Sequence, residues 1–340
     1  MKEKLVNIVY YFVDLLPPLV QHKIKIILNV LFHDWRISSM VMPGFDYYKA
    51  LYGLSDEEIE RRCAGLDQKS LAVMKRFIRV QTRYYITDPA NCFYSRKGIY
   101  TQAELRESRK WYRESERMRR KYKLRKFVDY ASSLVLHHGL RELDDKQKEY
   151  LQGSVFVDAG AFIGDSTLVM LQYNPEKIYA FEPSRINGAA YCETMKKNHI
   201  PSNRFELVYA GLGKDNTTIE SFDDTGFEGT NITERTGNDQ IHIVTLDSFM
   251  KDRAGRVGFI KTDVEGVGVD LIRGAEQTIR RDLPVLSLAI YHNEDELFGT
   301  YQLLKSWELP YRYELKKMSY CWENAEIILM AYPEINHGAK

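Results

Sequence analysis

The sequence predicts an α/β fold in its C-terminal part, preceded by a mainly helical N-terminal region. From Ser154 onward, short apolar runs alternate with helical stretches, as expected for a parallel sheet covered by helices on both faces. Before about residue 135, apolar residues recur at helical spacing and no strand alternation stands out. We therefore expect a helical domain over residues 1–138 and a ligand-binding α/β domain over 139–335.

The composition is that of a globular protein, and its cysteines are expected to be free thiols. The 340 residues are 44% hydrophobic and 28% charged, which is ordinary for such a chain. The formal net charge of +1 gives no reason to expect a nucleic-acid partner. The four cysteines are scattered without metal-ligand spacing, so we expect a reducing compartment and no disulfide or zinc framework. They are Cys63, Cys92, Cys192 and Cys321.

The apolar N-terminal stretch 5–32 is not expected to cross a membrane. Asp14, Lys23 and Lys25 interrupt it and Pro17-Pro18 divides it, so no apolar run reaches the roughly 20 residues that a span needs. No small-residue cleavage site follows an early apolar run. We expect a cytoplasmic protein without a membrane span.

Helical spacing and capping signals divide the N-terminal region into helices. The prolines separate two amphipathic stretches, and Ser55 with Glu58 forms a capping-box pattern before a third. The predicted helices cover 4–16, 19–34, 55–65 and 68–84. Residues 127–150 are also predicted to be helical, with an interruption at His137-His138-Gly139. Adjacent histidines face different sides of a helix, so a metal pair is not expected there.

The segment 106–126 is strongly basic, with eleven Lys or Arg residues against three Glu. It has two interpretations: a patch that binds phosphate or another anionic group, or a long solvated helix whose basic stems cover apolar neighbours. Charge runs are usually solvated faces, which favours the second.

Seven apolar runs are predicted strands of the C-terminal sheet, and the last two form an antiparallel pair at its edge. They are 154–158, 177–182, 205–210, 257–263, 284–291, 311–317 and 325–331. The boundary between the two domains falls within 130–152.

A glycine turn follows the first predicted strand. Gly160 and Gly164 leave room for a ligand at the backbone, and Asp165 follows them. A dinucleotide-binding turn would have G-x-G-x-x-G, but here the spacing is G-x-x-x-G, and the Asp165 carboxylate would repel a pyrophosphate. An acid there suits a ligand with amino or hydroxyl groups. S-adenosylmethionine fits, because it carries ribose hydroxyls, an ammonium and a sulfonium but no phosphate.

Glu182 ends the second strand, 18 residues after Gly164. In a βαβ nucleotide site, an acid at this place accepts hydrogen bonds from the two ribose hydroxyls. The predicted cofactor-binding residues are Asp158, Gly160, Ala161, Phe162, Gly164, Asp165, Ser166, Glu182, Pro183 and Asp263.

Five segments carry family motifs: VDAGAFIGDST (157–167), YAFEPSRIN (179–187), VTLDSF (244–249), FIKTDVEGVGVDLIRGA (259–275) and LAIYH (288–292). They give the sequence from about Gly139 to Tyr332 a resemblance to the FkbM-type S-adenosylmethionine-dependent methyltransferases. It implies a class I methyltransferase, Rossmann-like fold: a mostly parallel seven-stranded sheet with an antiparallel C-terminal hairpin. Members commonly methylate hydroxyl groups on sugars or natural products, so the resemblance implies O-methylation of a small-molecule acceptor such as a sugar or glycoconjugate.

The chain departs from the family pattern at two places. Phe162 stands where many members have Asn, which bears on the methionine pocket. Val267-Gly268 follows the DVEG turn where Ala-Glu is common, which removes an acid.

Candidate catalytic residues lie at the carboxyl ends of the predicted strands, where α/β sheets bind ligands. Asp263 and Glu265 close the fourth strand, and we expect one of them to orient the acceptor hydroxyl or to bind a metal that does; either could instead cap a helix over 266–281. Lys261 shares the face of Asp263 in a strand, and either pairs with an acid or touches substrate. His292 ends the fifth strand and has the ordinary pKa best suited to a general base.

Two other functions remain open from the sequence. A nicotinamide-dependent oxidoreductase would use the same βαβ unit, although G-x-G-x-x-G is missing. A non-catalytic binding module would keep the fold and lose the acceptor side. The polar stretch 217–240 is predicted to be either a substrate lid or an ordinary surface excursion.

Overall fold

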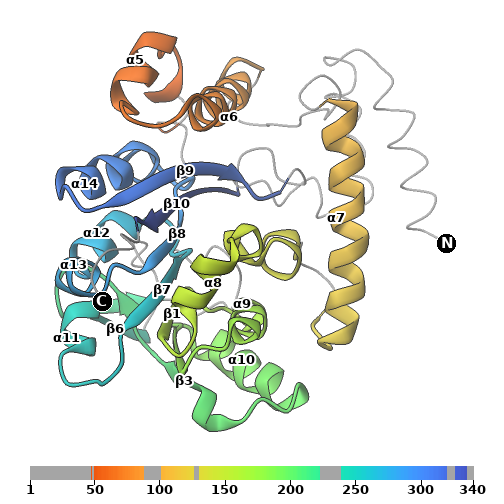
Figure 1. The fold of residues 1–340 in the computed structure, drawn as a ribbon, viewed down its shortest axis with the longest axis vertical. Coiled ribbons are helices and arrows are strands. Elements are labelled where there is room, and N and C mark those ends of the chain that lie inside the picture. The colour runs from red at the N-terminus through yellow and green to blue at the C-terminus, as the bar shows by residue number, and fades with distance from the viewer. Residues whose placement is uncertain are drawn as a thin grey trace.

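The computed structural model describes residues 47, 50–87, 101–125, 130–222, 239–319 and 326–334. Its centre is a seven-stranded sheet in the order β3-β2-β1-β7-β8-β10-β9 (Figure 1). The strands are β1 (Val155–Ala159), β2 (Lys177–Phe181), β3 (Phe205–Val208), β7 (Val257–Thr262), β8 (Val285–Ala289), β9 (Tyr311–Lys317) and β10 (Ile327–Pro333). All seven predicted strands are confirmed.

Strand directions follow the class I methyltransferase arrangement. β1 pairs in parallel with β2 and β7, and the parallel set extends to β3 and β8. β10 is antiparallel to both β8 and β9, which confirms the predicted reversal at the C-terminal edge. Strand β1 lies in the interior of the sheet and is completely buried, which explains why Val155-Phe156-Val157 form a continuous apolar run instead of an alternating one.

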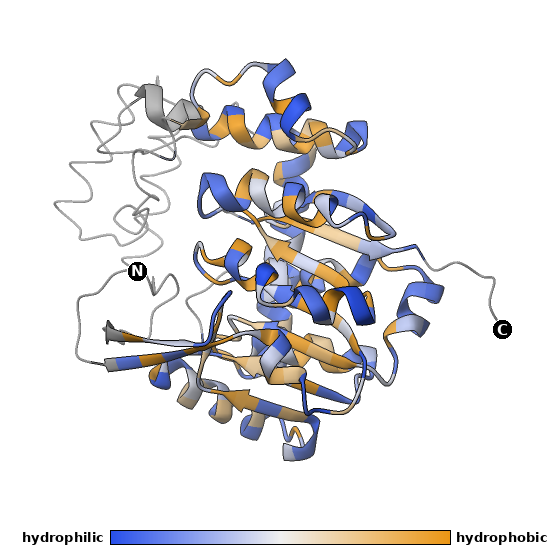
Figure 2. Ribbon diagram, turned by 90° about the vertical axis from the view of Figure 1, so that its left-hand side faces the viewer, coloured by the Kyte–Doolittle hydropathy of each residue, from blue (hydrophilic) through white to orange (hydrophobic). Residues whose placement is uncertain are grey.

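Helices cover both faces of this sheet (Figures 1 and 2). One face packs against α8 (Asp145–Leu151), α9 (Asp165–Met170) and α10 (Arg185–Lys197). The other packs against α11 (Leu246–Met250), α12 (Gly268–Arg273), α13 (Glu276–Asp282) and α14 (Thr300–Ser306). The single helix expected over 266–281 is wrong. It breaks between α12 and α13 at Gly274, where an added Cβ would lie 2.0 Å from the Gly213 carbonyl oxygen.

Two of the predicted N-terminal helices pack on the sheet. They are α5 (Asp56–Arg62) and α6 (Gln68–Thr87), and their buried residues share one hydrophobic core with α14 and β9. The Ser55 cap is confirmed, because the Glu58 amide donates to Ser55 Oγ at 3.2 Å. The helices expected over 4–16 and 19–34 lie outside the described residues.

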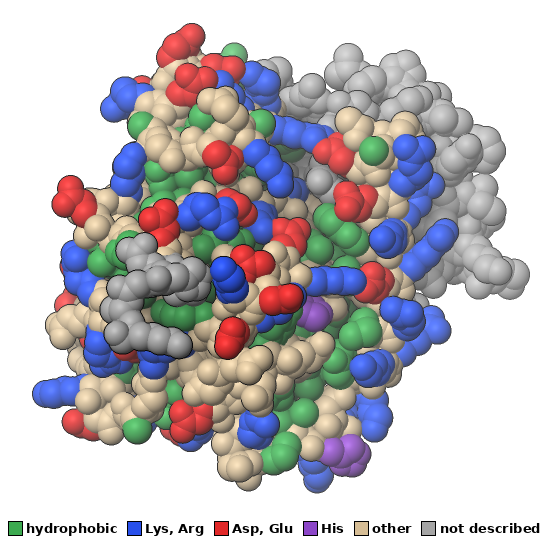
Figure 3. Space-filling view, in the orientation of Figure 1, with side chains coloured by type: hydrophobic (Ala, Val, Ile, Leu, Met, Phe, Trp, Pro, Cys, Tyr) green, Lys and Arg blue, Asp and Glu red, His purple; other side chains and the backbone are tan. Residues whose placement is uncertain are grey.

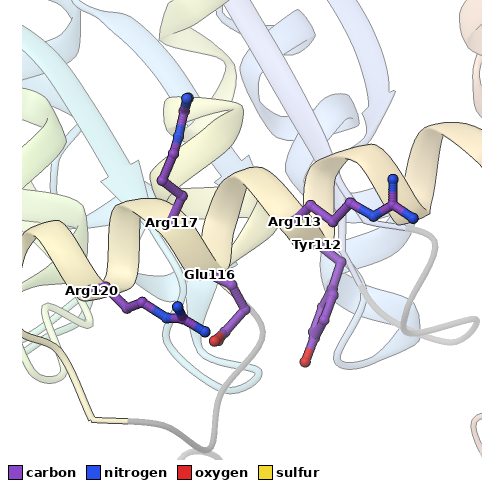
Figure 4. Close-up of a pocket in the computed structure, with 5 residues that line it drawn as sticks. All are labelled: Tyr112, Arg113, Glu116, Arg117 and Arg120. Atoms are coloured by element: carbon purple, nitrogen blue, oxygen red, sulfur yellow. The ribbon is translucent and has the colours of Figure 1, made fainter.

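The basic run forms α7 (Gln102–Lys121), which begins with an unpredicted capping box between Thr101 and Glu104. Most of its Lys and Arg side chains are exposed, and Figure 3 shows them along the helix at the right of the view. Arg119 pairs with Glu116 on the same helix. Among the described residues, those that line a hollow of about 520 Å³ all come from α7 (Figure 4). This exposure supports the interpretation of the segment as a solvated helix.

The segment before β1 is helical with an interruption, as predicted. It consists of η1 (Ala131–Val135), η2 (His137–Glu142) and α8. His137 and His138 have φ values of +50° and +49°, so the chain turns at this pair.

A second sheet joins β4 (Gly211–Leu212), β6 (Asp239–Val244) and β5 (Thr217–Phe222) in that order. This sheet was not predicted, and both ends of the polar stretch 217–240 belong to it. Residues 223–238 lie outside the described part, so the choice between a lid and a surface excursion stays open. Within the described ranges, no helix combines the length and the apolar character needed to cross a membrane.

Candidate active site

The glycine turn between β1 and α9 passes directly against the end of β7. Gly160, Phe162 and Gly164 all have left-handed φ values, of +75°, +46° and +86°. A Cβ on Gly160 would lie 1.9 Å from the Asp263 carbonyl oxygen, so only glycine fits between the two strand ends. Phe162 takes up its left-handed conformation without the tolerance that Asn has, which gives a physical reason for Asn at this place in the family.

A buried set of polar groups supports this turn from below. Asp158 is 0% exposed, and its Oδ2 accepts hydrogen bonds from Ser166 Oγ at 2.6 Å and Thr167 Oγ1 at 2.9 Å. Lys261 Nζ lies 3.3 Å from Asp158 Oδ1 and donates to the Gly160 carbonyl oxygen at 2.6 Å. The side chains of Asp158 and Ser166 therefore face the interior and hold the turn in place, and their contact with a cofactor stays a prediction. For Lys261, the structure selects the ion pair.

Glu182 ends β2 beside the turn and is oriented by backbone amides. Its Oε2 accepts from the Phe162 amide at 2.9 Å and its Oε1 from the Ser184 amide at 3.0 Å. The residue is 6% exposed, and burial raises its pKa to about 7 against the opposing effect of these hydrogen bonds. The Asn187 side chain forms a further hydrogen bond with this carboxylate. The carboxylate is thus held in a fixed position at the strand end.

The remaining predicted cofactor residues surround the same turn. Ala161 is fully buried, and its amide donates to the Phe181 carbonyl oxygen, so this residue contributes backbone only. Asp165 and Pro183 are partly exposed. Burial raises the pKa of Asp165, while Ser133 and Lys261 act in the opposite direction.

Three predicted catalytic residues meet at the ends of β7 and β8. His292 Nε2 lies 3.3 Å from Asp263 Oδ1 and 3.6 Å from Glu265 Oε2. Tyr291, which was not predicted, donates its hydroxyl to Asp263 Oδ1 at 3.2 Å. Lys261, the fourth predicted residue, lies below the cluster at the Gly160 turn.

Electrostatics in this cluster favour a protonated His292 beside an ionised Asp263. Burial alone would lower the pKa of His292, but Asp263 and Glu296 outweigh it and raise the pKa well above its ordinary value. Burial opposes ionisation of Asp263, yet His292 and Lys261 lower its pKa to about 2. An imidazolium cannot accept a proton, so this geometry does not favour the predicted general-base role of His292.

The DVEG turn owes its shape to two glycines and to residues that follow β8. Gly266 has φ +99°, and its carbonyl oxygen accepts from Asn293 Nδ2 at 2.9 Å. The Gly268 amide donates to Glu296 Oε1 at 2.8 Å, and a Cβ on Gly268 would lie 2.7 Å from that oxygen. The buried Glu296 carboxylate therefore fills the space next to the position where family members commonly have an acid.

Sequence reasoning missed two residues near the cluster. Glu296 Oε2 lies 2.7 Å from His292 Nδ1, and it follows His292 by four residues. His138 is 9% exposed and lies within electrostatic range of Asp263 and Lys261. A spacing of four residues was a usable signal for Glu296, whereas nothing local connects His138 with a strand end 125 residues later.

The sheet order and the ligand-facing acids at its strand ends define a class I methyltransferase domain. Residues 158–315 match the family model of the methyltransferase FkbM domain. This segment of the chain is therefore similar to the methyltransferase FkbM domain.

Solved structures agree with this fold. The structure of methyltransferase FkbM from Methylobacillus flagellatus is similar with a TM-score of 0.51 and 17% identity, over 81% of this chain and 57% of that protein. The chain thus spans little more than half the length of that relative. No curated protein matches the chain significantly.

Two further structures are similar at lower TM-scores, which carry no weight for the fold. An rRNA methylase from Streptococcus thermophilus has a TM-score of 0.38 and 16% identity, over 56% of this chain and 92% of that one. A putative methyltransferase from Streptococcus mutans in complex with SAH has a TM-score of 0.34 and 14% identity, over 55% of this chain and 95% of that one.

Proposed function

We propose that the protein is an S-adenosylmethionine-dependent methyltransferase that methylates a hydroxyl group of a small molecule. The observation that carries this proposal is the set of acidic side chains at the carboxyl ends of β1, β2 and β7. Asp158 is paired with Lys261, and Asp165 and Glu182 lie within electrostatic range of the same lysine. Asp263 and Glu265 lie 3.3 and 3.6 Å from His292 Nε2. Such a site suits a cationic, phosphate-free ligand and opposes a pyrophosphate.

The residues at the glycine turn fit this cofactor. Glu182 presents oriented carboxylate oxygens, which would accept hydrogen bonds from ribose hydroxyls. The Gly160 turn brings the backbone against Asp263 without a side chain between them. When bound, S-adenosylmethionine supplies an electrophilic methyl group on a positively charged sulfur.

The acceptor side of the site lies at Asp263 and Glu265. Asp263 is ionised at neutral pH and partly exposed, so it can accept a hydrogen bond from the acceptor hydroxyl and orient its oxygen. As that oxygen forms its bond to the methyl carbon, the carbon–sulfur bond breaks and its electron pair returns to sulfur. The hydroxyl proton passes to a carboxylate, and Glu265, with its side chain 36% exposed, is placed to transfer it to solvent.

Isothermal titration with S-adenosylhomocysteine and, in parallel, with NAD tests the cofactor. We expect saturable binding of the first only, weakened about tenfold or more by Glu182→Gln because the neutral amide is a poorer acceptor for two hydroxyls. Asp263→Asn should keep that binding and lose turnover. A folded protein that binds NAD and not S-adenosylhomocysteine would show that the proposal is wrong.

The acceptor class and the cellular location are part of this proposal. A sugar, glycoconjugate or natural product is expected from the resemblance to hydroxyl-methylating family members, and a cytoplasmic location from the cysteine pattern. Comparing small-molecule extracts from cells with and without the gene would identify the methylated product directly.

A further inference from the structure

Asp263, Glu265 and His292 form a cluster with the dimensions of a metal site. One ligand atom from each, the Nε2 of the histidine and one oxygen of each carboxylate, all lie within 4.8 Å of one another. Ligand atoms about 2.0–2.2 Å from a common centre are separated by roughly 3–4 Å. The distances of 3.3 and 3.6 Å from His292 Nε2 to the two carboxylates agree with this geometry.

The orientation of His292 is fixed from its other side. Its Nδ1 lies 2.7 Å from Oε2 of Glu296, which is only 1% exposed. Glu296 is held in turn, because its Oε1 accepts from the Gly268 amide and its own amide donates to Asn293 Oδ1. A carboxylate on the second ring nitrogen is the usual support of a metal-binding histidine, and it directs Nε2 toward the other two ligands.

Two buried histidine nitrogens lack a satisfactory hydrogen bond within the described part of the chain. They are Nε2 of His292 and Nε2 of His138. His138 is nine-tenths buried, comes from η2 on a distant part of the chain, and interacts electrostatically with Asp263. A buried polar atom without a partner is costly, so Nε2 of His292, which lies between the two carboxylates, is a second indication that a ligand belongs here.

The charge of the cluster defines what kind of ligand it would hold. Three carboxylates, Asp263, Glu265 and Glu296, surround one imidazole, whereas Lys261 is directed at Gly160 and Asp158. Mg²⁺ and Ca²⁺ prefer oxygen ligands throughout, but one imidazole with two carboxylates suits Mn²⁺, Fe²⁺, Co²⁺ or Zn²⁺. We propose that Asp263, Glu265 and His292 bind one divalent transition-metal ion, with Glu296 as the positioning residue of the histidine.

This site deepens the proposed function and rests on it for its role. A cation between Asp263 and Glu265 would bind the acceptor hydroxyl oxygen and favour its deprotonation beside the methyl group. The binding of the metal itself requires no methyl transfer, so it is testable alone.

The experiment uses Mn²⁺ as the probe with the full-length chain, without cofactor, and follows the free Mn²⁺ signal by electron paramagnetic resonance. We expect one Mn²⁺ per chain. Glu265→Gln and His292→Gln should each weaken binding at least tenfold, and Glu296→Gln by about 10–100-fold. Asp295→Asn is the matched control, because this exposed acid follows the cluster by three residues; it should change the affinity less than twofold.

Two results would overturn the metal site: no saturable Mn²⁺ binding by the folded wild-type chain, or binding that is equally tight in the Glu265→Gln and His292→Gln variants. A parallel titration with S-adenosylhomocysteine separates this failure from that of the proposed function. Cofactor binding without Mn²⁺ binding rejects only the metal site. Mn²⁺ binding without cofactor binding leaves the metal site and rejects the methyltransferase proposal.

Discussion

Lys261 Nζ on β7 donates a hydrogen bond of 2.6 Å to the carbonyl oxygen of Gly160 in the turn after β1. The same ammonium lies 3.3 Å from Asp158 Oδ1, and both side chains are buried. Burial alone would lower the pKa of Lys261, but Asp158 and Asp263 outweigh it and keep the lysine charged. One buried ion pair therefore fixes the position of the turn relative to the acceptor-side acids.

Replacing Lys261 should destabilise the protein strongly. Lys261→Met leaves the Asp158 carboxylate buried without its cation, which costs about 3–5 kcal/mol of unfolding free energy. Asp158→Asn in the same chain removes the uncompensated charge while keeping an oxygen for Ser166 and Thr167, so the double variant should recover part of the loss. Urea unfolding of the four proteins of this cycle measures the coupling, and additive losses would contradict the ion pair.

Gly160 and Gly153 offer a matched comparison of backbone strain and contact. Both have positive φ, +75° and +66°, but a Cβ on Gly153 meets nothing within 4 Å. Gly153→Ala should cost about 1 kcal/mol from backbone strain alone. Gly160→Ala should cost about 2 kcal/mol more, since its Cβ overlaps the Asp263 carbonyl oxygen. Equal losses of unfolding free energy in the two variants would show that the Gly160 turn makes no close contact with the end of β7.

The raised pKa of Glu182 predicts a pH-dependent stability in the absence of cofactor. Its pKa is about 7 in the folded protein and 4.5 ordinarily, so between these values the folded state holds a proton that the unfolded state has lost. Unfolding free energy should therefore fall as pH rises from 4.5 to 7, by up to about 3 kcal/mol.

Glu182→Gln should remove this dependence, whereas Glu149→Gln, an exposed acid on α8, should leave it unchanged. Thermal unfolding at pH 5, 6, 7 and 8 measures it. A wild-type profile that matches Glu182→Gln would contradict the raised pKa.

His138 should make the protein sensitive to acid. Burial lowers its pKa to about 3, so between pH 6.5 and 3 the histidine is protonated in the unfolded state and neutral in the folded state. Stability should fall as pH falls through this range, by about 2 kcal/mol between pH 6.5 and 4.5 from this group.

His138→Asn, which tolerates the left-handed backbone, should make that fall shallower. His199→Asn is the control, because His199 is also left-handed, with φ +55°, but exposed. Parallel acid-unfolding curves for all three proteins would contradict this role of His138.

The sequence predicted the parts of the site that depend on one strand and its end. Apolar runs followed by an acid placed Glu182 and Asp263 at one sheet edge, and the parallel order of the strands then required them to converge. It could not predict what depends on distant segments meeting, such as the Glu296 carboxylate lying next to Gly268. The break at Gly274 likewise follows from contact with Gly213 and not from local helix signals.

Ser70 on α6, 2% exposed, accepts a hydrogen bond at 2.9 Å from the Leu315 amide of β9, the last strand of the sheet. An outermost strand normally presents unpaired amides that recruit strands of other molecules. Here a serine hydroxyl saturates one of them, and the apolar face of α6 shields the surrounding strand. A fragment that starts at residue 139 would lose this cover. We expect it to self-associate through β9 in size-exclusion chromatography, although every residue of the methyltransferase domain would still be present.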